Sequence, residues 1–315
     1  MNTMHAVVVD PTAPGRLAIR EVDCPTPLPH EALVRVRAVS LNRGEVRRAQ
    51  TAAAGWRPGW DLAGTIEVAA TDGSGFPAGT RVVGFVPSGA WAEYVPVAAD
   101  SLAVLPPSVD FKDAATLPVA GLTALLALER GGLLLGKSVL ITGASGGVGH
   151  FACQLACHAG ANVTAQVRRS QLVEFVKNTG AQQIVVGSDQ ESLAQHGPYD
   201  LILDSVGGET LSAILETLAP DGECVLFGTT AGAEVTFNAS HFYGKGGLKL
   251  YGFILFHELK KQSVSAGLTQ LVNLLIQGLL VPHIDREASW TEISDVAQQL
   301  TQRQFLGKAV LWVSS

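Results

Sequence analysis

The fold of this chain is decided by the stretch Val139-Leu140-Ile141-Thr142-Gly143-Ala144-Ser145-Gly146-Gly147-Val148-Gly149. An apolar run typical of a strand buried on both faces leads into a glycine-rich turn, and the turn leads into a helical segment. Glycines let the backbone approach a pyrophosphate, and a helix amino terminus offers unpaired N–H groups. Ala144 replaces the first glycine of the G-x-G-x-x-G pattern, but the strand–turn–helix context supports the same interpretation. The stretch predicts a dinucleotide-binding site; a structural turn in an unrelated α/β domain is the alternative.

The residues after the next predicted strand, 162–167, indicate which dinucleotide binds. An NAD site places Asp or Glu there to accept a hydrogen bond from the ribose 2′-hydroxyl. Here Arg168 and Arg169 follow the strand, and no acid does. Guanidinium groups suit a 2′-phosphate, so the sequence favours NADPH over NADH. A solvated basic turn is the alternative, and which of the two arginines contacts the phosphate is left open.

Strands and helices alternate around this turn. The expected strands are 138–142, 162–167, 184–186, 199–204, 223–228 and 248–253. The expected helices are 148–159, 170–179 with Ser170 as its cap, 209–218, a long helix near 257–278, and 291–303. Six strands with intervening helices predict an α/β fold with a doubly wound parallel sheet.

The first hundred residues have a different character. Segments 34–39, 65–68 and 81–85 alternate apolar and polar residues with the period of half-buried strands. Glycine- and proline-rich turns separate them, which predicts an antiparallel, barrel-like region. The last predicted strand, 308–313, has no evident partner in the parallel sheet and could return to this region.

Composition excludes several classes of protein. With 47% hydrophobic and 16% charged residues, the chain is not intrinsically disordered. Its net charge of −6 and the lack of a basic block argue against a nucleic-acid partner. Four cysteines in 315 residues do not make a disulfide framework. We find no targeting signal and no apolar run of about 18 residues, so we expect a soluble, cytoplasmic protein without a membrane partner.

Several motifs carry a family resemblance that covers nearly the whole chain. Besides the glycine turn they are Ser40-Leu41-Asn42, Pro58-Gly59-Trp60-Asp61-Leu62-Ala63-Gly64, Gly79-Thr80-Arg81-Val82-Val83-Gly84, Ala120-Gly121-Leu122-Thr123-Ala124, Tyr199-Asp200-Leu201-Ile202-Leu203-Asp204-Ser205-Val206-Gly207-Gly208 and Gly307-Lys308-Ala309-Val310-Leu311. With them the chain resembles the medium-chain dehydrogenase/reductase superfamily, and most of all its zinc-free quinone oxidoreductase branch, which includes zeta-crystallin-like reductases.

The resemblance implies a GroES-like β-barrel catalytic domain over residues 1–118, a Rossmann NADP-binding domain over 119–257, and a segment 258–315 that returns to the catalytic domain. It also implies hydride transfer from NADPH to a small-molecule quinone or α,β-unsaturated carbonyl. Such conjugated acceptors need little help from a Lewis acid, because their charge delocalises onto a remote oxygen. The protein mainly aligns the reactants and excludes water.

The resemblance also implies the site residues. Asn42 would lie beside the nicotinamide ribose and the substrate, and Thr123 near the nicotinamide ring. For Asn42 the alternative role is a turn brace, and for Thr123 a helix cap or a buried hydroxyl. The residues expected to cradle the pyrophosphate are Ser145, Gly146, Gly147 and Val148. Those expected to flank the nicotinamide are Gly228, Thr229, Gly252 and Phe253. Asp204 is expected to end its strand in a structural role.

No metal site is expected. Zinc dehydrogenases of this superfamily carry cysteine where Asn42 stands, Gly-His-Glu where Gly59-Trp60-Asp61 stands, and a second cysteine near Ala120. The side chains present here cannot make a tetrahedral zinc site. His150, Cys153 and Cys157 share one helical face, but we interpret them as core residues.

Two departures from the family keep the substrate open. Gly187 stands where a tyrosine is frequent after the third strand, and residues 50–56 lack the tyrosine that many relatives have. An enoyl-thioester reductase is therefore an alternative enzyme, and an NADPH-binding redox sensor or interaction protein is a non-enzymatic alternative. The predicted edge strand 248–253 indicates a homodimer, because an exposed edge can pair with a second copy.

Overall fold

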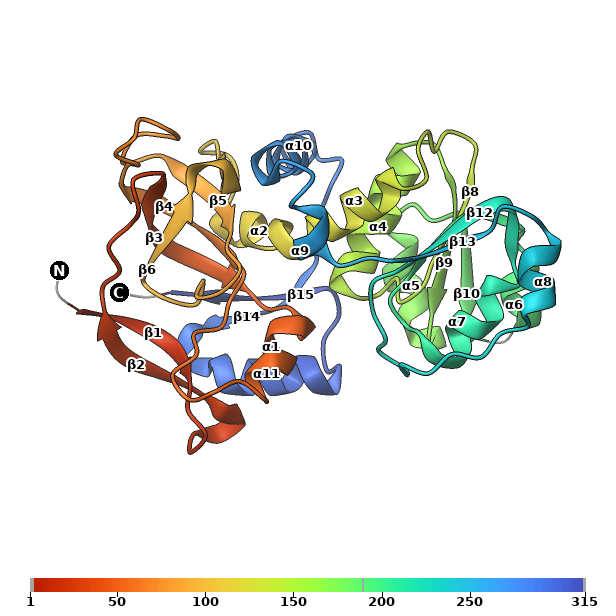
Figure 1. Cartoon of the computed structure of the whole chain (residues 1–315), viewed down its shortest axis with the longest axis horizontal. Helices are drawn as coiled ribbons and strands as arrows, with labels where there is room; N and C mark the ends of the chain where they lie inside the picture. Colours follow the sequence, from red (N-terminus) through yellow and green to blue (C-terminus); the bar gives the residue numbers. More distant parts are fainter. Residues whose placement is uncertain (1–2, 189, 314–315) are drawn as a thin grey trace. The chain divides into compact units, whose positions relative to one another are not determined.

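The segment around the glycine turn forms one parallel sheet of six strands, in the order β10-β9-β8-β11-β12-β13 (Figure 1). The strands are β8 (Ser138–Ile141), β9 (Asn162–Val167), β10 (Gln183–Val186), β11 (Tyr199–Asp204), β12 (Leu218–Leu226) and β13 (Lys249–Gly252). The chain moves outward from β8 to β10, then returns to the centre and moves outward from β11 to β13. Right-handed crossovers then place helices on both faces. The predicted doubly wound sheet is confirmed.

The structure is a computed structural model that describes residues 3–188 and 190–313. It divides the chain into two units, one running up to Leu122 and again from Leu259 onward, the other spanning Thr123–Glu258. The sequence expectation put these borders after residues 118 and 257. The helices of the second unit are α3 (Leu122–Glu129), which begins at the border, α4 (Gly147–His158), α5 (Val173–Lys177), α6 (Gln190–Ala194), α7 (Gly208–Leu215), α8 (Ala239–Gly244) and α9 (Leu255–Glu258).

The first unit is built on a mostly antiparallel sheet in the order β14-β15-β3-β4-β5-β7, with β6 paired to β3. These strands are β3 (Glu31–Ser40), β4 (Asp61–Val68), β5 (Arg81–Phe85), β6 (Tyr94–Ala98), β7 (Leu102–Val104), β14 (Ile284–Ser289) and β15 (Lys308–Trp312). A separate hairpin joins β1 (Thr3–Val9) to β2 (Leu17–Asp23). The helices are α1 (Arg43–Ala49), α2 (Phe111–Ala115), α10 (Val264–Ile276) and α11 (Ile293–Gln302), with a π-helical turn at Leu117–Gly121.

The last strand returns to the amino-terminal region, as the sequence suggested. β15 pairs antiparallel with β3, and Val310 lies opposite Ser40. Its other neighbour, β14, runs parallel to it and was not predicted. The polar side chains of β14 hide its strand character, since none of its residues is fully buried. This return brings Lys308, at the start of β15, to the end of β3.

Three local expectations were wrong. The long helix near 257–278 is interrupted after Glu258 and begins again as α10, because the Ser263 hydroxyl accepts from Ala266 N–H and caps a new helix. Ser170 lies inside the first helical turn after β9 rather than capping it, and Arg169 precedes that turn without a side-chain cap. The helix 209–218 ends at Leu215, so Leu218 already belongs to β12.

Each unit has its own apolar core. In the first unit the core includes Trp91, Leu62 and Ile66, all at most 1% exposed. In the second unit Tyr199 and Leu193 are fully buried. Among the described residues, no helix combines the length and the apolar character that crossing a bilayer requires.

Candidate functional site

The glycine turn lies at the carboxyl edge of the parallel sheet, where the strand order reverses between β8 and β11. Gly143 has a φ of +61°, and a Cβ atom there would lie 2.5 Å from the Ser205 hydroxyl oxygen. The turn after β8 therefore packs directly against the loop after β11. In open α/β sheets this reversal point is where ligands bind.

Close backbone contacts shape the turn. A Cβ atom on Gly149 would lie 2.4 Å from the Gly143 carbonyl oxygen, so α4 can approach the turn only with glycine at this position. Gly146 N–H donates to the same carbonyl at 3.0 Å, and Gly146 itself is exposed. No side chain caps the first turn of α4. An uncapped helix start with an exposed glycine suits a pyrophosphate.

The four residues expected to cradle the pyrophosphate lie together in this turn. Ser145, Gly147 and Val148 are half-buried, and Gly146 is the exposed member between them. Their backbone therefore reaches the surface of the second unit without side-chain bulk from Gly146 and Gly147.

A residue that the sequence analysis missed braces the turn. Gln166 is 4% exposed in β9, and its Oε1 accepts from Gly143 N–H at 3.1 Å. Its Nε2 donates to the Gly187 carbonyl at 2.6 Å. One amide thus ties the glycine turn to the end of β10. A glutamine in the second half of a strand that is buried from Val163 onward was the signal for it in the sequence.

The two arginines follow the carboxyl end of β9, and both are exposed. β9 neighbours β8 in the sheet, so Arg168 and Arg169 leave from the same edge as the glycine turn. NAD sites have an Asp or Glu directly after this strand. Here the strand ends at Val167, and Arg168 and Arg169 follow it instead. The two basic residues therefore lie on the surface at the edge of the sheet where the sequence analysis expected them.

The residues expected near the nicotinamide follow β12 and β13. A Cβ atom on Gly228 would lie 2.8 Å from the Ser205 carbonyl oxygen, so this segment also packs against the loop after β11. Thr229 is half-buried beside it. Gly252 is exposed, with open space where a Cβ atom would stand, whereas Phe253 is buried. Phe253 can thus offer a ligand little beyond its backbone.

Asp204 ends β11 in a structural role. Its carboxylate accepts from the Thr142 hydroxyl at 2.5 Å and from the N–H groups of Val206 and Gly207 at 3.1 and 2.9 Å. Burial raises the pKa of Asp204, and these donors oppose the rise. The carboxylate therefore shapes the loops around the glycine turn.

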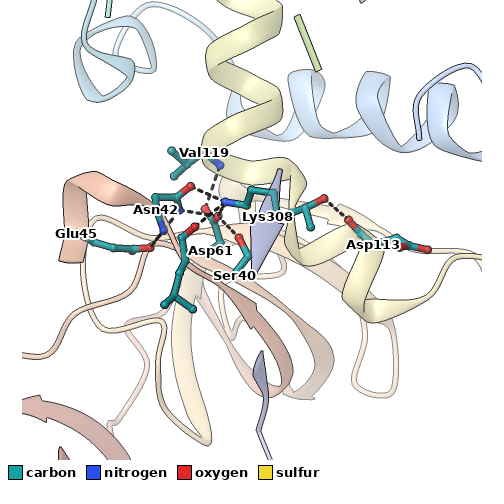
Figure 2. A network of polar contacts seen from close by, with 9 residues as sticks. Ser40, Asn42, Glu45, Asp61, Asp113, Val119 and Lys308 are labelled. Atoms are coloured by element: carbon teal, nitrogen blue, oxygen red, sulfur yellow. Dashed lines mark hydrogen bonds and ion pairs between the residues drawn. The ribbon is translucent and has the colours of Figure 1, made fainter. Parts of the chain in front are cut away.

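In the first unit Asn42 is the centre of a buried polar network (Figure 2). Its Nδ2 donates to Asp61 Oδ2 at 2.7 Å and to Glu45 Oε1 at 3.1 Å, and its Oδ1 accepts from Lys308 Nζ at 2.6 Å. Its backbone N–H donates to Glu45 Oε1 at 2.6 Å, which makes Asn42 the cap of α1. Asn42 thus makes the structural contacts that the sequence analysis gave as its alternative role. The contact with Lys308 was not predicted.

Asp61 and Lys308 form a buried ion pair, with Nζ and Oδ2 3.5 Å apart. Asp61 also accepts from the Ser40 hydroxyl at 2.6 Å and from Val119 N–H at 3.0 Å. Burial raises the pKa of Asp61, and the neighbouring ammonium opposes that rise. Burial lowers the pKa of Lys308, and Asp61 opposes that change in turn. Together they form a hydrogen-bonded charge pair in which each ion compensates the other.

A second carboxyl group, Glu45, lies in the same network and is fully buried. Burial, together with the charge of Asp61, raises the pKa of Glu45 well above its usual range. One ammonium cannot balance two buried carboxylates, and Lys308 pairs with Asp61. Glu45 is therefore the group that keeps a proton.

Thr123 belongs to the second unit, so the two units hold the two residues expected to act at the nicotinamide. Thr123 is 6% exposed near the start of α3. This burial agrees with the alternative that the sequence analysis gave for it, a buried hydroxyl.

The donor set does not suit a catalytic zinc ion. Asn42 and Asp61 are engaged by Lys308, while Trp60 and Ala120 offer an indole and a methyl group. Within residues 3–188 and 190–313, no three His, Cys, Asp or Glu side chains gather as metal ligands would. Cys153 is fully buried and burial raises the pKa of Cys157 to about 11, which suits packing rather than ligation.

Comparison with known proteins agrees with this geometry. Residues 28–107 match the alcohol dehydrogenase GroES-like domain, and residues 147–273 match the model described as zinc-binding dehydrogenase. A chloroplast envelope quinone oxidoreductase homolog of Arabidopsis thaliana is 34% identical over 70% of this chain and 74% of its own length. Prostaglandin reductase-3 of Mus musculus is 31% identical over 90% of this chain and 80% of its own length.

A solved structure with the same fold contains the cofactor. The mycobacterial protein Rv1454c, solved in complex with NADPH, is 26% identical, has a TM-score of 0.86, and covers 98% of this chain and 100% of its own. The predicted α/β fold, with a GroES-like domain and a Rossmann sheet, is confirmed, and the chain is an oxidoreductase that uses a nicotinamide cofactor. It belongs to the medium-chain dehydrogenase/reductase superfamily, in the quinone oxidoreductase branch.

Proposed function

We propose that this oxidoreductase uses NADPH to reduce a quinone or an α,β-unsaturated carbonyl, without a metal ion. The observation that carries the proposal is the pair of exposed arginine residues, Arg168 and Arg169, that follow β9 where an NAD enzyme has a carboxylate. A 2′-phosphate carries up to two negative charges, which guanidinium groups can meet with short, charge-assisted hydrogen bonds.

The bound cofactor would supply the hydride. The glycine turn would hold the pyrophosphate through backbone N–H groups of Ser145–Val148, and Gln166 would keep the turn in place. The absence of a zinc donor set at Asn42 and Trp60 favours a conjugated acceptor, since its negative charge spreads over several atoms during hydride transfer. Named quinone oxidoreductases and a prostaglandin reductase among the relatives support the same class of acceptor.

The cofactor preference is tested by fluorescence titration with NADPH and NADH. We expect wild-type protein to bind NADPH at least about tenfold more tightly, because charge-assisted hydrogen bonds contribute about 1.5–3 kcal/mol. Arg168→Glu and Arg169→Glu, made separately, identify the arginine that meets the phosphate, and we expect Arg168→Glu to have the larger effect. That variant should weaken the binding of NADPH far more than the binding of NADH. Equal weakening of both would mean that the 2′-phosphate binds elsewhere. Lys112→Glu serves as a control, because Lys112 pairs with Glu287 in the first unit.

The acceptor is tested by turnover on simple quinones, enals and enoyl thioesters, before and after dialysis against a chelator. We expect NADPH oxidation with quinones or enals that is unchanged by the chelator. Turnover confined to enoyl thioesters would replace the proposed acceptor class, and activity that is lost and then restored by zinc would contradict the metal-free reaction. Binding without turnover on any acceptor would favour a sensor or interaction protein.

We further propose a homodimer that pairs the β13 edges of two copies. β13 ends the strand order of the parallel sheet, and Leu250 on it is 41% exposed. Light scattering should give twice the monomer mass of 33.0 kDa. Leu250→Pro would remove a backbone donor from the edge and should yield monomers; a monomeric wild-type protein would contradict the proposal.

A further inference from the structure

In the described part of the chain, the edge strand β13 pairs with a single neighbour, β12. It is four residues long and ends at Gly252. Because β8, β11, β12 and β13 run parallel, Gly252 and Phe253 lie at the edge of the sheet that holds the glycine turn. A short strand that is paired on one side depends on side-chain contacts to fix its end. Tyr251, the residue before Gly252, makes these contacts.

The side chain of Tyr251 is held at its ring and at its hydroxyl group. The guanidinium carbon of Arg130 lies 4.0 Å from the centre of the ring, which is the distance of a cation–π contact. The hydroxyl donates to Glu258 Oε1 at 2.6 Å, and Glu258 is 6% exposed. The ring cannot rotate away without breaking these two contacts, so they also hold the backbone of Tyr251.

Arg130 is itself anchored to β12. Its Nε donates to Glu223 Oε1 at 2.7 Å, and the Glu223 side chain is 8% exposed. A hydrogen bond between two charged groups is stronger than one between neutral groups. This bond is the main cause that raises the pKa of Arg130, and the charge of Glu258 adds to the rise. From its position directly after α3, one guanidinium group thus links β12, β13 and α9, all within the second unit.

The elements that Arg130 links are those that lead to the residues expected beside the nicotinamide. α3 contains Thr123 near its start, β12 leads to Gly228 and Thr229, and β13 leads to Gly252 and Phe253. The residues expected to hold the other half of the cofactor follow β8 and β9. In the sheet, β11 separates β8 and β9 from β12 and β13. A change at Arg130 should therefore affect one half of the cofactor and not the other.

We propose that Arg130 is a positioning residue for the nicotinamide half of the cofactor. Through the ring of Tyr251 it fixes the backbone of Gly252 and Phe253, along which that half binds. Arg130 acts through these residues and needs no contact with the cofactor. This inference rests on the proposed NADPH-dependent reaction.

The test compares the whole cofactor with a fragment that lacks nicotinamide. Dissociation constants of NADPH and of adenosine 2′,5′-bisphosphate are measured by calorimetry for wild type and Arg130→Met. We expect the variant to bind NADPH about 3- to 30-fold more weakly, the range for a residue that acts through others, and to bind the bisphosphate as wild type does.

Lys245→Met is the matched control for this comparison. Lys245 also links elements of the second unit, but it does so just before β13, at the opposite end of the strand from Gly252. Its Nζ donates to the carbonyl oxygens of Glu216 at 2.6 Å and Leu218 at 2.9 Å. We expect this variant to bind both ligands as wild type does.

A second variant and a second measurement guard against misfolding. If Arg130→Met does not fold because the Glu223 carboxylate has lost its partner, Glu223→Gln is added to it, and the same loss of NADPH affinity is expected. Amide hydrogen exchange then locates the change. Exchange at Tyr251–Phe253 should become faster, including the Phe253 N–H that donates to the Leu226 carbonyl at 2.8 Å, whereas exchange in β8 should not change.

Equal weakening of NADPH and the bisphosphate, or no weakening of either, would overturn the role of Arg130. If wild type prefers NADH, the same comparison is made with NADH and adenosine 5′-monophosphate, so the preference for NADPH can fail while this inference holds. Wild-type protein that binds neither cofactor would overturn both the proposed function and the role of Arg130.

Discussion

Glu45 makes the stability of the first unit depend on pH, and Glu45→Gln should remove that dependence. Glu45 is fully buried, and within the described residues its Oε2 has no hydrogen-bond partner. Burial raises the pKa of Glu45 well above its usual range, so the folded protein keeps a proton that the unfolded chain loses near pH 4.5. Such a group stabilises the fold at low pH, and its contribution is lost as pH rises toward the folded pKa.

The magnitude follows from that shift. Between the unfolded and folded pKa values, one group changes the free energy of unfolding by about 1.4 kcal/mol per pH unit. As pH rises above the unfolded pKa of about 4.5, the wild type should therefore lose stability relative to Glu45→Gln by up to about 1.4 kcal/mol per pH unit, until pH reaches the raised pKa of the folded state. The glutamine keeps an acceptor for Asn42 and leaves one buried polar group without a partner, as protonated Glu45 does. The two proteins should thus be within about 1 kcal/mol of each other at the acidic end.

The assay is urea unfolding followed by tryptophan fluorescence at several pH values. All five tryptophans, at positions 56, 60, 91, 290 and 312, lie in the first unit, so the signal reports on the unit that holds the network. Glu21→Gln, on the exposed face of β2, is the matched control and should run parallel to wild type. Parallel curves for Glu45→Gln and wild type would refute the protonated, buried Glu45.

Two further predictions concern the glycine turn. Gly149→Ala places a Cβ atom 2.4 Å from the Gly143 carbonyl, so it should cost about 1–3 kcal/mol of stability and weaken NADPH and NADH alike by at least about tenfold in titrations. Gly244→Ala in α8 has open space around its Cβ and should change neither quantity. Gln166→Leu keeps a side chain of similar size in β9 but removes both hydrogen bonds that brace the turn, so both cofactors should bind about 5- to 20-fold more weakly, with the ratio between their affinities unchanged. A selective loss of NADPH would show that Gln166 acts on the 2′-phosphate side instead.

The sequence predicted structural features correctly where those features depend on residues close together in the chain. The glycine turn, the strand β9 and the arginines after it lie within about thirty residues of sequence, and their geometry follows from backbone freedom, hydrophobic period and chain order. In two other segments the pattern of the residues predicted the wrong secondary structure. Residues 257–278 have the composition of one helix, yet Ser263 begins a new one, and the polar face of β14 concealed a strand.

What the sequence by itself determined is the class of fold and the glycine-lined turn at the carboxyl edge of the parallel sheet, because glycine positions and alternating strands and helices leave few other architectures. Only the tertiary structure decided what Asn42 can do. Lys308 stands 266 residues further along the chain and reaches Asn42 because β15 pairs with β3. Which hydrogens of an amide remain available depends on every neighbour that burial brings to it, and no spacing along the chain records those neighbours.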